Sequence, residues 1–310
     1  MRADPPNGNR RRFASVSFWV GAFVQLRKKS LSDLGRSIPW ASRRRTDLQI
    51  AGNRRVTHVP VARLASPSAC GGRPVKLVDG STVAHTFWLG TDSFGRDLYS
   101  RVVYGAQVSL LVGGFTAALA LALGGFLGMP AGYFRQVDAV LMRFMDGLMA
   151  IPAILLAIAL VAALGAQVGT VVVAIAIPEV PRVTRLVRSL VLSLREEPFV
   201  EAARALATPT PVILWRHILP NALAPLIVQG TFVAASAVLT EAILSFLGLG
   251  LPPDIPTWGN IMAEGRVQFS QYPGNVLYPA LFLVPTVLAV NLLGDGLRDV
   301  LDPKFAKRGA

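Results

Sequence analysis

Glu201-Ala202-Ala203-Arg204-Ala205-Leu206-Ala207 is a short polar segment between long apolar stretches. After Pro209 and Pro211, it is followed by Ile218-Leu219-Pro220-Asn221. Pro198 suits the first position of a helix, where its missing N–H is not needed, and Pro209 prevents the helix from continuing. Between Pro198 and Pro209, four apolar residues recur with the spacing of one helix face: Phe199, Ala202, Ala203 and Leu206. We therefore expect a compact helix whose alanine-rich face suits docking against a partner or, alternatively, packing on its own protein.

A second short helix is expected directly after the first. Thr210 is a suitable N-cap, Pro211 is a suitable first helical residue, and apolar residues continue through Val212–Leu219. The two short helices would together form a loop over residues 195–221, between two apolar segments.

The composition is that of a membrane protein, with 52% hydrophobic residues, 16% charged residues and a mean hydropathy of +0.49. The single cysteine, Cys70, excludes an internal disulfide framework, and the three histidines lack the H-E-x-x-H spacing of a zinc site. No G-x-x-x-x-G-K-[S/T] loop is present. We therefore expect no metal, no bound cofactor and no catalytic residue on this chain, so any ATP hydrolysis would occur on another polypeptide.

Five long apolar segments predict an all-α transmembrane domain, because helices are the only open-chain structures that pair every backbone polar group within lipid. The expected spans are residues 108–129, 148–164, 168–190, 223–247 and 276–293. Arginine is concentrated around residues 195–221 and basic residues close the chain, whereas residues 165–169 and 250–275 carry few charges. Since basic loops remain cytoplasmic, we expect the 195–221 loop and the C-terminus to face the cytoplasm.

Residues 1–86 form a basic N-terminal region in which no spanning helix is visible. Residues 1–80 carry sixteen Lys or Arg and four Asp or Glu, and the apolar run Phe18–Leu26 is short beside the roughly 20 residues of a span. Five spans would leave this basic region outside the cell unless a sixth exists. Three interpretations stay open: a genuine extension, an interfacial helix around Phe13–Leu26, or an incorrect reading frame or start. Contact with anionic lipid or cytoplasm is expected, and nucleic acid is not.

Residues 195–221 resemble the EAA loop of permease subunits in ATP-binding-cassette (ABC) importers, which docks on the ATPase subunit. The resemblance runs from about Phe87 to Pro303, and its further motifs are Arg216-His217-Ile218-Leu219-Pro220-Asn221, Thr240-Glu241, Ser245-Phe246-Leu247-Gly248-Leu249-Gly250, Asn291-Leu292-Leu293-Gly294-Asp295-Gly296-Leu297-Arg298-Asp299 and Leu301-Asp302-Pro303. Together they are similar to the C-type permease of dipeptide, oligopeptide and nickel importers. The family usually has glycine at the position of Ala207, where a left-handed conformation would cost alanine about 1–2 kcal/mol.

The resemblance implies a MetI-like type I ABC permease, a fold that normally has a sixth, N-terminal span. It implies a cell-membrane subunit that translocates peptides, with a homologous second permease, two ABC ATPases that bind ATP and Mg, and an extracytoplasmic solute-binding protein. The chain is expected to divide into four regions: the basic N-terminal region 1–86, an extracytoplasmic segment 87–105 before the spans, a transmembrane permease domain 106–300 and a cytoplasmic tail 301–310. The residues expected to couple to the ATPase are Glu201, Ala202, Ala203, Arg204, Leu206, Ala207, Ile218, Leu219 and Pro220.

Two carboxylates within expected spans, Glu179 and Glu241, must face protein or a wet cavity. Each either lines the pathway and meets a cationic or amino-terminal part of the substrate, or is a structural residue bonded to a neighbouring helix. Five prolines within spans would kink their helices around such a pathway: Pro152, Pro178, Pro181, Pro225 and Pro285.

Two further stretches lie outside the expected spans. Leu89–Asp97 resembles the family segment ahead of the second span, and we interpret it as a polar turn without chemistry. Leu251–Asn260 is proline-rich and is expected to be an external surface loop with Trp258 at the membrane interface. The resemblance implies that this loop approaches the solute-binding protein.

Three other functions remain open. The chain could import nickel or another small solute of the same family. It could be a proton-coupled secondary transporter that uses Glu179 or Glu241, or a membrane assembly factor for which residues 195–221 are only a docking site.

Overall fold

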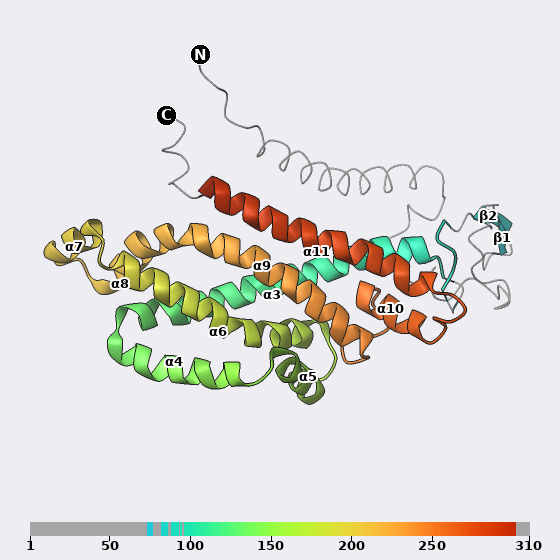
Figure 1. The fold of residues 1–310 in the computed structure, drawn as a ribbon, viewed down its shortest axis with the longest axis horizontal. Helices are drawn as coiled ribbons and strands as arrows, with labels where there is room; N and C mark the ends of the chain where they lie inside the picture. Colours follow the sequence, from blue (N-terminus) through green and yellow to red (C-terminus); the bar gives the residue numbers. More distant parts are fainter. Residues whose placement is uncertain (1–72, 77–81, 86–87, 93, 95, 302–310) are drawn as a thin grey trace, which may run out of the picture. The chain divides into compact units, whose positions relative to one another are not determined.

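The computed structural model describes residues 73–76, 82–85, 88–92, 94 and 96–301 (Figure 1). The interpretations of residues 1–72 and of the tail after Leu301 lie outside the described residues. Ahead of the helices, β1 (Arg73–Lys76) pairs in antiparallel fashion with β2 (Thr82–His85), and Arg73 lies opposite His85. This hairpin was not expected from the sequence.

The described chain after the hairpin is helical, which confirms the all-α prediction for the apolar part of the sequence. The helices are α3 (Leu98–Tyr133), α4 (Arg135–Ala150), α5 (Ala153–Leu164), α6 (Val168–Leu194), α7 (Pro198–Ala205), α8 (Thr210–Val212), the π-helix η2 (Ile213–Ile218), α9 (Leu219–Phe246), α10 (Trp258–Arg266) and α11 (Gly274–Leu301).

Three helical stretches among the described residues are long and apolar enough to cross a membrane: 98–133, 210–246 and 274–300. A fourth span results if α4 and α5 are counted as one broken helix, bent by 88° at the break. The expected span over residues 168–190 forms α6, which is 27 residues long. This helix is not among the three apolar stretches because it carries too many charged residues, Glu179, Arg182 and Arg185, within its apolar part.

The expected continuous span over residues 148–164 is not observed, because α4 ends at Ala150 and α5 begins at Ala153. Pro152 is the N-cap of α5, and Ile151 has the extended conformation that proline favours in the residue before it. Proline also lacks the N–H that would continue the helical hydrogen bonds. Other predicted in-span prolines, by contrast, lie inside helices: Pro178, Pro181, Pro225 and Pro285.

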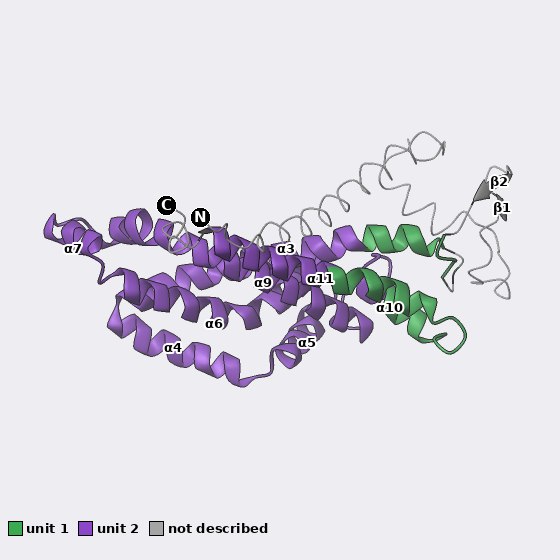
Figure 2. Cartoon of the chain, turned by 45° about the horizontal axis from the view of Figure 1, so that its top comes forward, with its two compact units in different colours: residues 1–105, 261–285 green, residues 106–260, 286–310 purple. Residues whose placement is uncertain are grey.

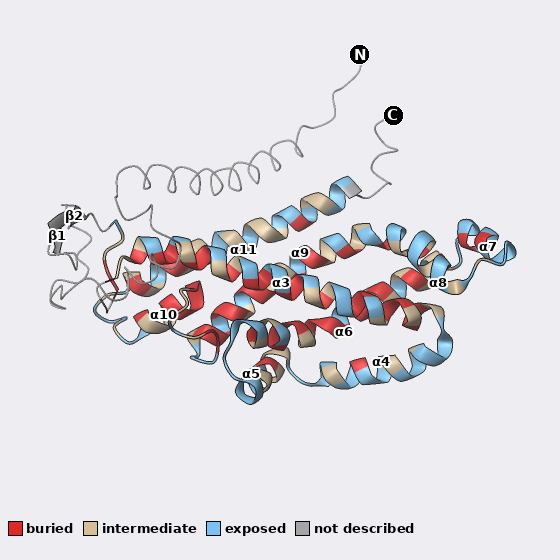
Figure 3. Ribbon diagram, turned by 180° about the vertical axis from the view of Figure 1, so that it is seen from behind, coloured by how far each residue is buried: buried red, intermediate tan, exposed pale blue. Residues whose placement is uncertain are grey.

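The chain divides into two compact units, coloured separately in Figure 2: residues 1–105 with 261–285, and residues 106–260 with 286–310. In the second unit, α6 lies between α4 and α9 (Figure 1), with α5 packed against it. Buried residues run along α6 and α9, drawn red in Figure 3. One apolar cluster joins α3, α6, α7, η2 and α9, so these elements share a core.

The approach of α3 to α6 depends on glycines spaced by four residues. A Cβ added at Gly124, Gly128 or Gly132 would lie 2.6 Å from the Cβ of a facing valine of α6. The facing residues are Val183, Val187 and Val191, all fully buried. Small residues at this spacing let two helix backbones approach closely within a membrane.

The segment expected to be an external surface loop is more ordered than predicted. Trp258 is fully buried and begins α10, so the expected interfacial position of its side chain is wrong. The Asn260 side-chain amide donates hydrogen bonds to the carbonyls of Leu251, Pro252 and Ile255, which folds the proline-rich segment back on the start of α10.

Candidate functional site

Helix α7 is anchored through one face. Pro198 occupies its first turn after the N-cap Glu197, as predicted. Val200 and Ala203 are buried in the apolar cluster that also contains Ile213 and Ile218 of η2. A helix of eight residues is too short to be stable in isolation, so this packing holds it in place.

The rest of the α7 surface is exposed and carries both apolar and charged residues. Leu206 is 82% exposed and Phe199 is 39% exposed, and Glu201, Ala202 and Arg204 are also exposed. Of the four residues expected to share one face, Ala203 is the one that is buried, together with Val200. We refer to the exposed side of α7, formed by Phe199, Glu201, Ala202 and Leu206, as the α7 outer face.

The C-terminus of α7 is closed by Ala207 in a left-handed conformation, with φ of 54°. The Ala207 N–H donates to the Arg204 carbonyl at 2.9 Å, and the Thr208 N–H donates to the Ala203 carbonyl at 3.1 Å. These two bonds define a Schellman motif, whose left-handed residue is usually glycine. The turn therefore has the shape that glycine would give it, although an alanine occupies the position.

The second short helix does not end at Leu219 as expected. Pro209 rather than Thr210 is its N-cap, and α8 continues through η2 into α9 as a single helical stretch. Pro220 has no N–H to complete the α-helical bond to the Arg216 carbonyl, which favours a local change of repeat to the π-helix. The Asn221 side-chain amide donates to the His217 carbonyl at 2.6 Å.

The predicted coupling residues of the second segment differ in exposure. Ile218 is fully buried, Leu219 is half-buried and Pro220 is exposed. On η2 itself, Trp215 is 60% exposed, which adds an aromatic side chain that the sequence analysis did not select.

Two arginines connect the 195–221 segment to the end of α3. The Arg204 guanidinium lies 5.2 Å from the centre of the Tyr133 ring, within the range of a cation–π contact. The Arg195 guanidinium donates to the Gly132 carbonyl at 3.5 Å. Together with the buried residues of α7, these contacts attach the first half of the segment to the end of α3.

Glu241 on α9 is fully buried, and hydroxyl groups surround its carboxylate. The Ser245 hydroxyl donates to Oε1 at 2.8 Å, the Ser109 hydroxyl on α3 donates to Oε2 at 3.2 Å, and the Thr257 hydroxyl is a further partner. These hydroxyls also bind the backbone, since Ser245 accepts from the Leu251 N–H and Ser109 from the Trp258 N–H. Glu241 therefore connects α3, α9 and the chain that leads into α10, a geometry that favours its structural interpretation.

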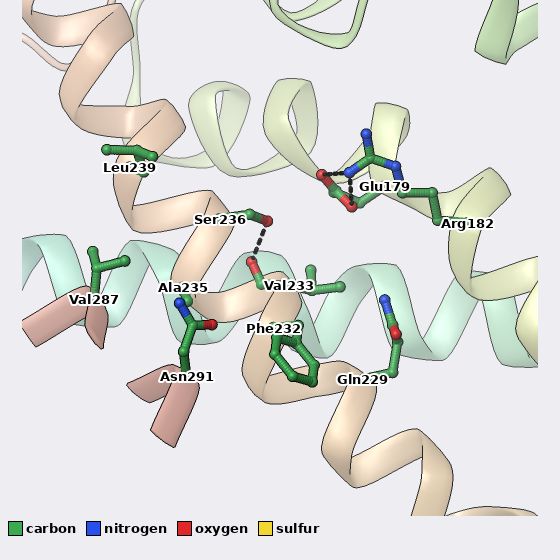
Figure 4. Close-up of a pocket in the computed structure, with 10 residues that line it drawn as sticks. All are labelled: Glu179, Arg182, Gln229, Phe232, Val233, Ala235, Ser236, Leu239, Val287 and Asn291. Atoms are coloured by element: carbon green, nitrogen blue, oxygen red, sulfur yellow. Dashed lines mark hydrogen bonds and ion pairs between the residues drawn. The ribbon is translucent and has the colours of Figure 1, made fainter. Parts of the chain in front are cut away.

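Glu179 on α6 lies beside a cavity of about 350 Å³ (Figure 4). Nη1 of Arg182 donates to both of its carboxylate oxygens, at 3.1 and 3.3 Å. The cavity is lined by residues of α6, α9 and α11: Glu179, Arg182, Gln229, Phe232, Val233, Ala235, Ser236, Leu239, Val287 and Asn291. Glu241 does not line this cavity. The two carboxylates that were expected to have the same possible roles therefore lie in different environments.

A charged cluster that was not expected from the sequence joins the segment before α3, the first turn of α3 and α10. Oδ1 of Asp92 accepts the N–H groups of Phe94 and Arg96 at 2.9 Å, which fixes the expected polar turn. Its Oδ2 accepts from Arg96 and Arg101, and both arginines also bind Glu264. The cluster balances two positive charges with two negative ones and joins segments more than 160 residues apart.

Within the described residues, no group of three or more His, Cys, Asp and Glu side chains is arranged to hold a metal ion.

A family profile described as "Binding-protein-dependent transport system inner membrane component" matches residues 105–307. This chain belongs to that family. The match covers every described helix from the second turn of α3 onward, including α7, η2 and the cavity. As a member of the family with several apolar helices, the chain is a multi-pass membrane protein.

Curated relatives cover most of the chain. A probable peptide ABC transporter permease of Sinorhizobium fredii is 50% identical over 80% of this chain and 80% of its own length. The dipeptide transport system permease protein DppC of Alkalihalophilus pseudofirmus is 42% identical over 95% of this chain and 92% of its own length. The glutathione transport system permease protein GsiD of Pectobacterium atrosepticum is 44% identical over 74% of this chain and 76% of its own length.

Solved inward-facing structures of the MetNI methionine ABC transporter are similar to 66% of this chain and to 95% of their own chain. Their TM-scores are 0.47 and 0.48, at 20% sequence identity.

Proposed function

We propose that this chain is one of two membrane-spanning permease subunits of an ATP-driven importer of peptides, with ATP hydrolysed by partner subunits. The complex would contain a homologous second permease, two ABC ATPases that hold ATP and Mg, and an extracytoplasmic solute-binding protein. In the inner or plasma membrane, the 195–221 segment and the C-terminus would face the cytoplasm, where the basic residues of this segment belong.

The observation that carries the proposal is the α7 outer face. An exposed leucine and an exposed phenylalanine, on a helix whose other side is packed into the core, form a rigid apolar surface suited to a protein partner. Trp215 of η2 adds an aromatic residue of the kind enriched in binding interfaces.

The same packing provides a path for movement from an ATPase to the membrane helices. Val200 and Ala203 of α7 share a buried cluster with Val187 and Val191 of α6 and with Leu226 of α9. A displacement of α7 would therefore move the cytoplasmic ends of α6 and α9, because a packed core transmits strain rather than absorbing it. The cavity between α6, α9 and α11 would then alternate between outward and inward access, as nucleotide shifts a two-state population.

The proposal that the substrate is a peptide is based on the names of the curated relatives. Those reported above are named for the transport of a peptide, of a dipeptide and of glutathione, which is itself a tripeptide. The residues proposed for coupling are those predicted from the sequence, with Val200 and Ala203 on the anchoring side.

The proposal is tested by placing a charge on the α7 outer face. Leu206→Glu should abolish co-purification of the ATPase subunits with the permease and abolish ATP-dependent dipeptide uptake in proteoliposomes, because a buried carboxylate would have no partner in the apolar interface. Insertion of the variant in the membrane should be unchanged, since Leu206 contributes little to the core.

Val267→Glu is the matched control, because Val267 is also 82% exposed and belongs to the segment that follows α10. It should leave the ATPase subunits bound. Normal ATPase binding by the Leu206→Glu variant would refute the docking role of α7. An absence of ATP-dependent peptide uptake by the complete wild-type complex would refute the proposed activity.

A further inference from the structure

We propose that the cavity between α6, α9 and α11 is a transit site for a zwitterionic dipeptide, in which Glu179 binds the terminal ammonium and Arg182 binds the terminal carboxylate. This inference rests on the proposed function and names the substrate class and the residues that would meet it. It assigns a role to an ion pair that the coupling mechanism does not use.

The position of the ion pair is the first argument. Glu179 and Arg182 stand one turn apart on α6, and both line the cavity (Figure 4). The carboxylate side chain is 10% exposed and the guanidinium side chain is 54% exposed, so the pair lies at the edge of the cavity rather than sealed within the core. Carboxylates are costly within a membrane domain, and those that occur commonly mark a substrate or ion path.

The unused donors of Arg182 are the second argument. Glu179 engages only Nη1 of the guanidinium among the described residues, which leaves Nη2 and Nε for another acceptor. A guanidinium presents its donors as a planar fork that matches a carboxylate with two parallel hydrogen bonds. A ligand carboxylate can therefore bind Arg182 while the ligand ammonium binds Glu179, so no charge is left unpaired during the exchange.

The remaining lining fits a short peptide. Gln229 and Asn291 bring amide groups from α9 and α11, which can pair with a peptide bond, and Phe232 and Leu239 supply apolar surface for side chains. A volume of about 350 Å³ is at the lower end of small-molecule sites, which suits a dipeptide better than a long chain.

Competition between substrate and the internal ion pair also suits transport. A site on a permeation path must bind its substrate well enough to admit it and weakly enough to release it. The ligand must break the Glu179–Arg182 ion pair to bind, and this ion pair re-forms when the ligand leaves. This competition lowers the affinity of the cavity for the ligand and favours release.

The test measures occupancy of the cavity directly, independent of the solute-binding protein. Because Cys70 is the single cysteine, Cys70→Ala yields a cysteine-free chain, and Ser236→Cys then places one thiol in the cavity wall. In the complete importer in nanodiscs, a zwitterionic dipeptide should slow alkylation of this thiol, whereas the N-acetylated dipeptide amide, with neither terminus charged, should not.

Glu179→Gln and Arg182→Gln should each raise the dipeptide concentration needed for half-protection by about tenfold or more, the effect of losing one hydrogen bond to a charged group. Arg185→Gln is the matched control, because Arg185 lies on the same helix and pairs with Asp146 instead of lining the cavity. It should leave protection unchanged.

Three results would overturn the inference: no protection in the wild-type background, equal protection by the neutral analogue, or unchanged protection in both Gln variants. Co-purification of the ATPase subunits reports whether each variant is assembled. If a Gln variant fails to assemble, Asn291→Leu, which leaves the ion pair intact, should still weaken protection; unchanged protection by that variant would also overturn the inference. ATP-dependent dipeptide uptake by the wild-type complex in the absence of protection would refute this inference alone and leave the proposed function standing.

Discussion

Ala207 adopts a backbone conformation that glycine adopts at lower cost. Its φ of 54° brings the Cβ close to the carbonyl group of the preceding residue, a clash that costs an L-residue about 1–2 kcal/mol. The two hydrogen bonds of the Schellman motif and the proline two residues later hold the turn in this shape. Ala207 therefore adopts the turn that ends α7, but the free energy of unfolding is lower than it would be with glycine at this position.

Replacing Ala207 with glycine should stabilise the protein by about 1 kcal/mol, because relief of the clash outweighs the extra freedom of glycine in the unfolded chain. Thermal unfolding of the purified permease complex in detergent measures the change. Ala205→Gly is the matched control, since Ala205 is the exposed last residue of α7 and a glycine there should destabilise the helix by up to about 1 kcal/mol. The same sign of change for both variants would contradict this account of the turn.

Removing the Glu241 carboxylate should destabilise the membrane domain. Glu241→Ala leaves the Ser109 and Ser245 hydroxyls without their acceptor and opens a cavity, at a combined cost of about 3 kcal/mol or more. Glu241→Gln keeps one oxygen acceptor and should cost less. Thermal unfolding and peptide uptake distinguish the two roles of this residue: normal stability with abolished uptake in Glu241→Gln would contradict the structural role and indicate a pathway residue.

At the scale of the elements, the contact between α3 and α6 illustrates how glycine spacing sets helix packing. Gly128 faces Val187 and the Thr184 carbonyl, whereas Gly125, one turn earlier on the same helix, has no neighbouring atom within 4 Å of an added Cβ. The two glycines thus have different roles at nearly the same depth along α3.

Gly128→Ala should destabilise the protein by about 1–3 kcal/mol, because the new methyl group would lie 2.6 Å from the Val187 Cβ and force α3 and α6 apart. Gly125→Ala should be neutral or stabilising by up to about 1 kcal/mol, since alanine is the better helix former. Unfolding temperatures of the two variants in detergent provide the comparison. Equal destabilisation by both substitutions would show that the helices are not in close contact at Gly128.

The apolar segments could be predicted from the sequence because the length and hydropathy of a helix are local properties. The details around proline were harder to predict. Pro152 ends a helix, whereas Pro178 and Pro181 lie inside α6, and the difference depends on whether neighbouring helices support the interrupted backbone. The exposed and buried sides of α7 likewise depend on the packing of Val200 against η2, which periodicity alone does not specify.

For the candidate sites, the sequence identified single residues but not their partners. Glu179 and Glu241 were selected because carboxylates are rare within apolar segments. The contact of Glu241 with Ser109, 132 residues away, and the shared binding of Asp92 and Glu264 by two arginines arise only from the tertiary fold. The i, i+3 pair of Glu179 and Arg182 was within reach of helical spacing, but the cavity beside it was not.

For the whole molecule, the central claim is that the α7 outer face docks on an ATPase subunit at the cytoplasmic surface. Leu206 and Val267 allow one experiment to test both parts of the claim, because both side chains are 82% exposed and the described residues place them on separate segments. Single cysteines at these positions in the Cys70→Ala background report which side of the membrane each occupies.

The decisive measurement is cross-linking from these cysteines in intact cells that express the complete importer. Leu206→Cys is expected to form a covalent product with an ATPase subunit and to escape labelling by an impermeant thiol reagent added outside. Val267→Cys is expected to be labelled from outside and to form no such product. Labelling of Leu206→Cys from outside the cell, or the absence of any cross-linked ATPase subunit, would contradict the account.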